Sequence, residues 1–548
     1  MSVDQHVENT SAWAPFRHSA FAVLWMATVI SNIGTWMHDV ASGWLMTSLS
    51  PSPLMVALVQ AATSAPVFLF ALAAGALADL AGRRKLLITV MVLLFFNTLA
   101  LAGLVFTDRV TPWTLLLFTF LSGTGAAFVA PAWQAIVPQL VPRADLQSAI
   151  ALNGVGINIS RAIGPALAGA IIAAIGIAWP YLINAVSFLV VIAALVWWHP
   201  PPSPPSDLPA ERFFSAMRAG LRYVRASLAM RATLIRAVAF FLFVSAFWAL
   251  LPLVARQELN GGPQLYGIIL AAVGVGAVVG ALFLPRLARK FGPDQLVALG
   301  TLGTALVLIV LALVKRADAA IFASLLAGAC WITVLSRLNI SAQLALPDWV
   351  RARGLSIFIT IFFGSMTLGS ILWGQVATSI GIPFTQLVAA AGALIAALLS
   401  WRFRLLQGDE LNHSPSSYWP QPVVASDVSL DRGPVMVTVE YRIDPDNIQE
   451  FVAAICELKA SRQRHGAYAW GLFEDVADPG RMLEYFIEDS WVAHLRHHRR
   501  TSVLDSEIQQ RVLRFQANGS APRVTHYLAP DPLRPASDQA VVDDHSLR

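Results

Sequence analysis

For a chain of 548 residues, this sequence has few charged residues and almost no cysteine. Charged side chains make up 13% of it, whereas soluble domains carry about 25%. Its two cysteines, Cys330 and Cys456, lie in an apolar run and in a polar C-terminal region, which argues against a disulfide or a cysteine metal cluster. A phosphate-binding glycine loop, a Gly-x-Ser-x-Gly elbow and a zinc-protease signature are also lacking. These absences argue against an ATP-driven pump, and we expect no cofactor and no metal.

Long apolar runs fill the first three quarters of the chain. Hydrophobic residues make up 56% of the sequence, and between residues 20 and 405 they form runs separated by short charged breaks. A helix needs about 20 apolar residues to cross a bilayer, so each run predicts a membrane span. The first run is too long for a cleaved signal peptide. The predicted spans are 20–47, 54–79, 86–106, 112–138, 147–175 and 179–198, then 232–255, 264–286, 294–314, 319–346, 354–380 and 382–404.

A proline-rich break separates the two sets of six spans. It is followed by a basic stretch, Glu211 to Arg231, in which apolar residues recur at helical spacing. We predict an amphipathic helix there, lying along the membrane surface. Most arginines and lysines fall in loops on one side of the bilayer, so both termini and the central loop are predicted to be cytoplasmic, in the inner (plasma) membrane of a bacterium. Since this topology accounts for the basic residues, no nucleic-acid partner is expected.

The loop between the second and third spans carries glycines, an acid and a basic cluster. These residues are Gly75, Asp79, Gly82, Arg83, Arg84 and Lys85. Gly75 allows close helix packing, and Gly82 permits a tight turn. The pattern resembles the signature loop of the major facilitator superfamily. That resemblance implies that Asp79 latches two halves together near Arg351 and Arg353, where a helix N-terminus favours an anion. The alternative is a basic loop that only follows topology.

A second motif lies in the fifth span, where Gly164 and Pro165 are followed by Gly169. A proline inside a span kinks it, and small neighbours let another helix approach. The motif resembles the Gly-Pro motif of exporters in the same superfamily, although Ala168 replaces one glycine of the usual pattern. The resemblance implies export, and the alternative is a generic proline kink.

A wider resemblance covers the chain to about residue 405. The segments from Leu24 to Leu54 and from Val350 to Ser356 are similar to the enterobactin-exporter-like, or transmembrane secretion effector, branch of the superfamily. The resemblance implies an all-α membrane protein with the twelve-helix major facilitator fold, built from two six-helix halves. It also implies transport of siderophores, drugs or other small amphiphiles.

Polar residues inside the spans are the candidates for a substrate and proton pathway, because such groups are costly in hydrocarbon. Asp39 is the only carboxylate well inside a predicted span, and it shares a helical stripe with Asn32 and Trp36. We predict that Asp39 is the proton-coupling site, with His38 as a weaker candidate; the alternative is a hydrated or paired carboxylate. The remaining candidates lie in the fourth, fifth and tenth spans: Gln134, Asn158, Arg161, Arg337 and Asn339. The two arginines either contact an acidic substrate or Asp39, or clamp neighbouring helices.

The residues after a polar linker at 406–433 have the composition of a soluble domain. Alternating and helical patterns predict the order β-α-β-β-α-β of a ferredoxin-like domain, with one long helix from Trp491 through Val512. The segment resembles the dimeric α/β-barrel family that includes the antibiotic-biosynthesis monooxygenases, which implies a homodimer contact. His494 and His498 are four residues apart, but the sequence offers no carboxylate or cysteine that completes a site. We therefore expect a regulatory or dimerising appendage.

Together these patterns predict a secondary transporter that exchanges protons for a small amphiphilic molecule. Its alternatives are a membrane-tethered monooxygenase-like enzyme and a uniporter or importer without proton coupling. The lipid bilayer, the substrate and protons are the expected partners. The predicted parts are 1–199 and 232–405 for the two halves, 200–231 and 406–433 for linkers, 434–530 for the ferredoxin-like domain and 531–548 for a disordered tail.

Overall fold

A computed structural model describes residues 11–80, 82–199, 213–405, 432–500, 503–517 and 521–530. Within these residues, twelve helices are long and apolar enough to cross a membrane. This confirms the predicted number of spans. The latter part of the chain adds a small sheet with helices.

The first six long helices follow the predicted runs closely. Proline stands in the first turn of several, where its missing N–H costs nothing, and Thr111 caps the fourth through a capping box with Thr114. Gly82, with φ of +78°, makes the tight turn before the third helix. The helices are α1 (Ser19–Leu49), α2 (Pro53–Leu80), α3 (Arg83–Phe106), α4 (Pro112–Leu140), α5 (Leu146–Ile175) and α6 (Trp179–Trp197), with short 3-10 turns at Ala14–Arg17 and Arg143–Asp145.

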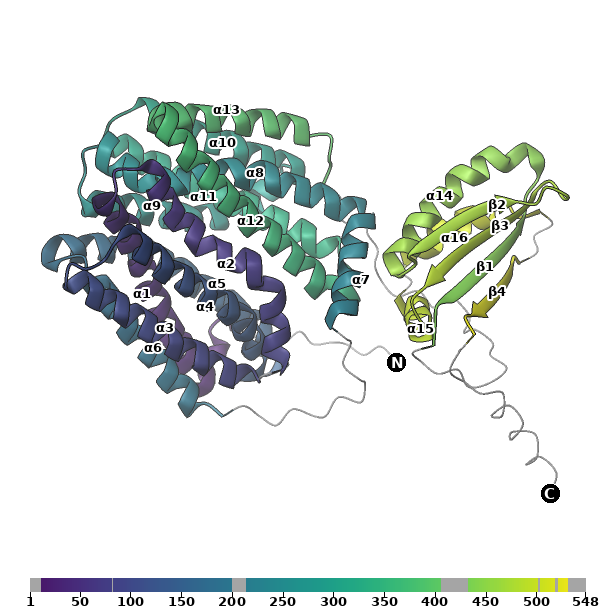
Figure 1. The fold of residues 1–548 in the computed structure, drawn as a ribbon, viewed down its shortest axis with the longest axis horizontal. Coiled ribbons are helices and arrows are strands. Elements are labelled where there is room, and N and C mark those ends of the chain that lie inside the picture. Colours follow the sequence, from purple (N-terminus) through teal and green to yellow (C-terminus); the bar gives the residue numbers. More distant parts are fainter. Residues whose placement is uncertain are drawn as a thin grey trace, which may run out of the picture. The chain divides into compact units, whose positions relative to one another are not determined.

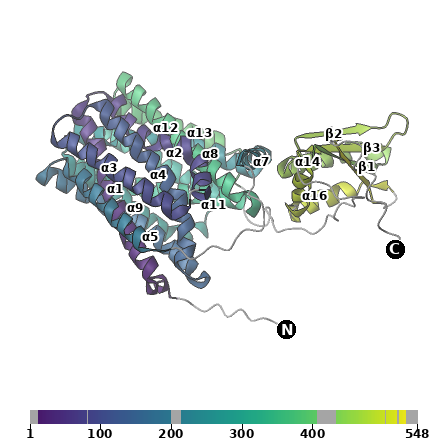
Figure 2. The same cartoon turned by 60° about the horizontal axis from the view of Figure 1, so that its bottom comes forward.

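The second set of six begins after a shorter helix, α7 (Phe213–Ala226). That helix confirms the predicted amphipathic segment, while its place on a membrane surface stays a prediction. The long helices are α8 (Leu228–Leu253), α9 (Pro263–Ala288), α10 (Pro293–Leu313), α11 (Ala317–Leu344), α12 (Asp348–Ile380) and α13 (Ile382–Ser400), and a π-helical turn, Val254–Glu258, extends α8. In Figure 1, α1–α6 and α8–α13 form two groups of helices packed side by side, and Figure 2 shows the same two groups from another direction.

The helical unit holds two buried apolar clusters, and one of them shows where the halves meet. One contains residues from both halves, among them Met46, Ile172, Leu250 and Tyr266, and it lies at the end of the bundle where α1 passes into α2. The other, at the opposite end, is built from α1, α3, α4, α5 and α6 of the first half. The halves therefore share one continuous apolar core at the α1–α2 end of the bundle.

The C-terminal domain has the predicted strand and helix order. Its strands β1 (Val435–Arg442), β2 (Ala469–Glu474), β3 (Arg481–Glu488) and β4 (Arg523–Leu528) form an antiparallel sheet in the order β2-β3-β1-β4. This is the ferredoxin-like order. Alternate β1 residues, from Val435 to Tyr441, are buried against α14 (Ile448–His465) and the later helices, and Figures 1 and 2 show the helices on one face of the sheet.

The helix predicted from Trp491 through Val512 is described as two helices. They are α15 (Trp491–Arg500) and α16 (Val503–Leu513), so the single helix was wrong. Both pack on the sheet: Trp491, Ile508 and Val512 all belong to the core of the domain. Two shorter helices place more side chains on one face of a small sheet than a single straight helix can.

Two compact units make up the chain. The first holds the twelve long helices except for short ends of α8, α11 and α12, and the second holds the C-terminal domain together with the segments 211–231 and 343–354, which include those ends. Within the second unit, Arg222 of α7 donates a hydrogen bond to Asp489 at 3.1 Å. The Tyr223 hydroxyl donates to the carbonyl of Ala345. The linker helix α7 thus has a polar connection to the C-terminal domain.

Candidate functional site

The best-defined polar group inside the helical unit lies where α1 crosses α5. The guanidinium of Arg161 stands over the ring of Trp36, 5.4 Å from its centre. Gly164 makes this crossing close, because a Cβ there would lie 2.6 Å from the Cβ of Trp36. The Gly-Pro motif and the Trp36 stripe, found separately in the sequence, therefore meet at one place.

Arg161 lacks a polar partner in the part of the chain that the structure describes. Its Nε is buried without a hydrogen bond, and no ion pair to Asp39 or any other described carboxylate is present. A guanidinium carries five N–H donors and is always charged. An unpaired arginine in a span is costly unless it faces water or an anion. Arg161 is therefore available to bind an anionic ligand.

Asp39 lies one helical turn beyond Trp36 on α1. Among the described residues, no hydrogen bond or ion pair reaches its carboxylate. The adjacent His38 is buried, its two ring nitrogens have no hydrogen bond, and its ring meets that of Tyr181 edge-on at 4.9 Å. Tyr181 and Ser42 share a hydrogen bond of 3.2 Å. Asp39 and His38 thus form a small titratable group flanked by hydroxyls.

The exporter-like motif also lies at the contact between the two halves. A Cβ on Gly267 of α9 would lie 2.5 Å from the carbonyl oxygen of Pro165, and one on Gly169 would lie 2.7 Å from that of Pro263. These values leave no room for a side chain, so α5 and α9 touch backbone to backbone. The close approach predicted for this motif is confirmed.

Polar ties across the halves accompany this contact. Arg256, after α8, donates a hydrogen bond of 2.8 Å to the Thr47 hydroxyl and also bonds Ser48 at the end of α1. Nearer the middle of the helices, the hydroxyls of Ser64 and Thr367 are 2.8 Å apart. The Arg256 bonds hold the same end of the bundle that the shared apolar core occupies, and the Ser64–Thr367 contact adds a tie between the halves farther along the helices.

The other predicted pathway residues are not brought together. Asn158 donates to the carbonyl of Gly154 in its own helix at 2.9 Å, and Asn32 is half-buried. Gln134 is exposed, and no hydrogen bond joins it to Asn339 in the described residues. Arg337 has a buried Nε without a hydrogen bond, as Arg161 does. Their roles stay predictions.

The basic residues of the signature loop act within the first half. Arg84 donates to the carbonyls of Leu195 and Val196 at the end of α6, where a cation suits the helix dipole. Arg83 donates to the carbonyl of Ala135, and Lys85 is exposed. The side chain of Asp79 and residue Gly75 lie outside what the structure describes in side-chain detail, so the latch stays a prediction.

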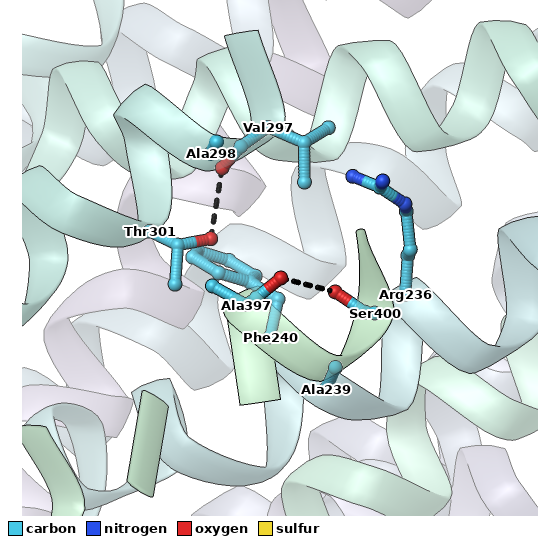
Figure 3. A pocket seen from close by; sticks show the side chains of 8 residues that line it. All are labelled: Arg236, Ala239, Phe240, Val297, Ala298, Thr301, Ala397 and Ser400. Atoms are coloured by element: carbon cyan, nitrogen blue, oxygen red, sulfur yellow. Dashed lines mark hydrogen bonds between the residues drawn. The ribbon is translucent and has the colours of Figure 1, made fainter. Parts of the chain in front are cut away.

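A small pocket within the second half belongs to none of these groups. Figure 3 shows it between α8, α10 and α13, lined by Arg236, Ala239, Phe240, Val297, Ala298, Thr301, Ala397 and Ser400. Arg236 is buried and pairs with Asp294 at 3.0 Å, and it donates to the carbonyl of Phe403. This cation, missed in the sequence, was visible as an arginine inside an apolar run. Its partners Asp294 and Phe403 both lie in the second half, so Arg236 ties α8 to the start of α10 and to the residues that follow α13.

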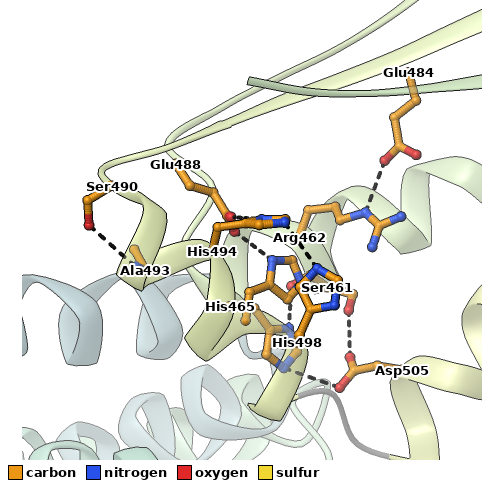
Figure 4. Close-up of polar contacts among 11 residues, drawn as sticks. Ser461, Arg462, His465, Glu484, Glu488, Ser490, Ala493, His494, His498 and Asp505 are labelled. Carbon is orange, nitrogen blue, oxygen red and sulfur yellow. Dashed lines mark hydrogen bonds and ion pairs between the residues drawn. The ribbon is translucent and has the colours of Figure 1, made fainter. Parts of the chain in front are cut away.

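The C-terminal domain holds a buried polar network on the helix-covered face of its sheet. Figure 4 shows two carboxylates of β3, Glu484 and Glu488, each bound by side chains from the helices. Glu484 accepts hydrogen bonds from Arg462 at 3.2 Å, from Trp470 at 3.0 Å and from Tyr441 at 2.9 Å. The full set of partners explains how a buried carboxylate is tolerated.

Glu488 holds His494, which the sequence analysis singled out, together with His497 on the same helix. The ring Nδ1 of His494 lies 2.7 Å from one of its oxygens, and Nδ1 of His497 lies 2.6 Å from the other. Burial raises the pKa of Glu488, but the two histidines outweigh it and hold that pKa well below its usual range. The expectation that no carboxylate joins these histidines was wrong, because Glu488 reaches them through the fold.

Comparison with known proteins gives the family. The family described as "transmembrane secretion effector" matches residues 10–533. The staphyloferrin A transporter of Staphylococcus aureus is 24% identical over 396 residues, which cover 70% of this chain and 97% of that protein. The enterobactin exporter EntS of Escherichia coli K12 is 26% identical over 422 residues, covering 75% of this chain and 96% of that protein.

Solved structures agree on the fold. A bacterial homologue of the human lysosomal transporter Spinster, in an inward-facing conformation, has a TM-score of 0.54 at 16% identity and covers 71% of this chain and 97% of its own. The nucleoside transporter NupG has a TM-score of 0.60 at 11% identity, covering 70% and 99%. The solved structures, the twelve spans in two halves and the family match all point to the same fold. Because the family match covers residues 10–533, the chain belongs to the transmembrane secretion effector family of the major facilitator superfamily.

Proposed function

We propose that this protein is a secondary transporter that exports a small anionic amphiphile of siderophore type in exchange for protons. The observation that carries this proposal is the unpaired guanidinium of Arg161 over the Trp36 ring. Arginine pairs well with carboxylates and other planar oxyanions, and an aromatic face beside it suits a flat ring. Relatives named as transporters of staphyloferrin A and enterobactin support the substrate class.

The contacts between the halves support transport by alternating access. The α1–α2 end of the bundle is closed by a shared apolar core and by Arg256. The distribution of basic loops supports an orientation in the inner membrane of a bacterium with this end outside the cell. In that orientation the protein is closed to the outside, and rocking of the two halves around Arg161 would release substrate there. Because α5 and α9 meet through glycine contacts at Gly169 and Gly267, the halves can separate there without breaking buried ion pairs.

Asp39 is the proposed coupling site. It lies on the same helix as Trp36, one turn nearer the closed end, and has no ionic partner among the described residues. A carboxylate so placed can take up a proton from outside when that end opens. His38 is the second candidate, because both of its ring nitrogens lack a hydrogen bond.

The test is proton flux driven by substrate in proteoliposomes that contain the full chain. We expect siderophores such as enterobactin and staphyloferrin A to drive flux in the unsubstituted protein, and Asp39→Asn to abolish it while substrate binding remains. Asp108→Asn is the matched control, because Asp108 lies in the exposed turn after α3. Full flux in Asp39→Asn would remove proton coupling at this site. Loss of binding in Asp39→Asn would make Asp39 part of the substrate site instead.

A further inference from the structure

Three histidines converge in the C-terminal domain. His494 and His498 lie one turn apart on α15, and His526 comes from β4. Their candidate ligand nitrogens all lie within 4.8 Å of one another, and the Nε2 atoms of His494 and His498 are 3.0 Å apart. The ring centres of His494 and His526 are 4.8 Å apart. Three imidazoles from two separate elements therefore share one small volume.

The sheet register places His526 in this group. On β4, His526 stands opposite Val437 of β1, whose side chain is buried under the helices. Cross-strand partners point to the same face, so His526 also faces the helices. The ring of Trp491, at the start of α15, packs against His494 at 5.4 Å and against His526 at 6.2 Å. This packing supports one wall of the group.

Glu488 sets the protonation of His494. Because an ionised carboxylate can only accept, the proton shared at 2.7 Å belongs to Nδ1 of His494. With Nδ1 held by Glu488, Nε2 is the ring nitrogen that faces His498, at 3.0 Å. A carboxylate that holds one ring nitrogen while the other faces a metal is the usual support of a histidine ligand.

His526 supplies a second observation that points to a ligand. Its Nε2 is buried and has no hydrogen bond to any described residue. A buried ring nitrogen without a partner is costly, and such atoms call for an explanation. The unpartnered nitrogen of His526, close to the ring nitrogens of the other two histidines, therefore supports a ligand at this group.

We propose that His494, His498 and His526 bind a divalent first-row transition ion, with Zn²⁺ as the expected ion, and that Glu488 is the positioning residue. Imidazole nitrogens suit Zn²⁺, Cu²⁺ and Ni²⁺, whereas Mg²⁺ and Ca²⁺ need oxygen ligands. Zinc–nitrogen bonds of about 2.1 Å in a tetrahedron separate two ligand nitrogens by about 3.4 Å, close to the spacing found here. Three protein ligands leave a fourth position for water or a further ligand.

The test uses the full chain, purified in detergent without a polyhistidine tag and stripped with a chelator. We expect one Zn²⁺ per chain in competition with a coloured chelator, and a tetrahedral absorption spectrum with Co²⁺. His498→Ala and His526→Phe should each weaken Zn²⁺ binding at least 100-fold. Glu488→Gln should weaken it about 10- to 100-fold and leave the Co²⁺ spectrum tetrahedral.

The control is His199→Asn, an exposed histidine at the end of α6, which should bind Zn²⁺ unchanged. Hydrogen exchange of β1 to β4 shows that each variant is folded; His498 and His526 are chosen because both are only partly buried, whereas His494 is fully buried. The proposal is overturned if the unsubstituted chain binds no stoichiometric Zn²⁺. It is also overturned if folded His498→Ala and His526→Phe proteins bind as tightly as the unsubstituted one.

Discussion

The guanidinium carbon of Arg161 lies 5.4 Å from the centre of the Trp36 ring, and Gly164 keeps the two helices that carry them in contact. A cation over an indole gains about 0.5–1 kcal/mol when exposed and about 2 kcal/mol when desolvated. That attraction holds the guanidinium in place without neutralising it. A charged group that is fixed but unpaired is suited to a ligand that brings the opposite charge.

Variants of Arg161 and Trp36 should therefore show how much of siderophore binding depends on the positive charge of Arg161 and how much on the aromatic ring of Trp36. We expect Arg161→Ala to weaken binding of an anionic siderophore at least 10-fold, which is about 1.4 kcal/mol, because the cation is lost. Arg161→Lys should keep part of the affinity, since lysine retains the charge but not the planar fork. Binding to the purified protein, measured by isothermal titration, checks both. Trp36→Phe should show a smaller loss, because phenylalanine is a weaker partner for a cation.

Arg337 is the matched control for that experiment. It is also an arginine in a span with a buried Nε that lacks a hydrogen bond, but no aromatic ring stacks on it among the described contacts. Arg337→Ala should leave binding closer to that of the unsubstituted protein than Arg161→Ala does. Equal losses in the two variants would mean that positive charge inside the spans in general, and not the Arg161 site, sets the affinity for the siderophore.

The transporter fold could be predicted from the sequence because a lipid span needs a long apolar run. Each of the twelve runs is strong by itself, and their bounds differ from the helices by a few residues, as where α12 begins at Asp348 instead of residue 354. Which polar residues meet was harder to predict. Trp36 and Arg161 were both chosen, but their contact depends on how α1 crosses α5, and no local pattern encodes a crossing.

The metal site illustrates the same limit in the C-terminal domain. His494 and His498 could be paired from their spacing, because four residues make one helical turn. His526 lies on a strand whose neighbours are set by the register of β4 on β1, and that register depends on residues far away in the sequence. Glu488 was missed for a different reason: it lies close to His494 and His497 in the sequence, but it ends a strand while they lie on the next helix, and no strand or helix pattern predicts how the turn between brings them together. Non-local pairing, more than local propensity, decided the site.

Gly267 should control the conformation of the transporter. A Cβ at this position would lie 2.5 Å from the Pro165 carbonyl oxygen, so Gly267→Ala forces α5 and α9 apart where the halves touch. Overpacking of this kind costs about 1–3 kcal/mol, enough to shift a two-state equilibrium about 5- to 150-fold. We expect distances between spin labels at Arg109 and Arg316, measured with both native cysteines replaced, to lengthen.

Gly103→Ala provides the comparison, since nothing lies within 4 Å of a Cβ there. That variant should leave the label distances unchanged, and its α3 helix should gain slightly in stability, because alanine favours the helix over glycine. If Gly267→Ala also left the distances unchanged, the contact of α5 with α9 would not be what closes this end.

The open face of the C-terminal sheet should join two copies of the chain. Phe473 is 59% exposed and Tyr527 50%, and both point away from the helices, as Leu483 does. We expect the full chain to be a dimer in nanodiscs by mass photometry, and Phe473→Lys with Tyr527→Lys to make it monomeric. Val476→Lys adds a lysine on a fully exposed turn, away from this face, and should keep the dimer. A monomer in all three proteins would contradict a dimer through this face.

Acid should destabilise the C-terminal domain through His465. Burial first, then the nearby His497 and Arg464, lower the pKa of His465 to about 4, while Asp505 at 3.3 Å opposes them. An unfolded histidine titrates near 6.5, so between pH 6.5 and 4 the unfolded chain binds the proton that the folded domain refuses. The contribution of His465 to the free energy of unfolding is therefore complete above pH 6.5. Below pH 6.5 the free energy of unfolding falls by up to about 1.4 kcal/mol per pH unit.

Hydrogen exchange of β1 to β4 in the chelated full chain, corrected for the intrinsic effect of pH, measures this loss. Glu488 adds to the slope only in the lower part of this window, where an unfolded glutamate begins to take up a proton, and it adds equally in the unsubstituted and His465→Gln proteins. His465→Gln removes the group that titrates, so its slope should be lower by up to about 1.4 kcal/mol per pH unit even where its overall stability is reduced. Equal slopes in the two proteins would mean that Asp505 keeps His465 charged in the folded domain, against the direction that its burial implies.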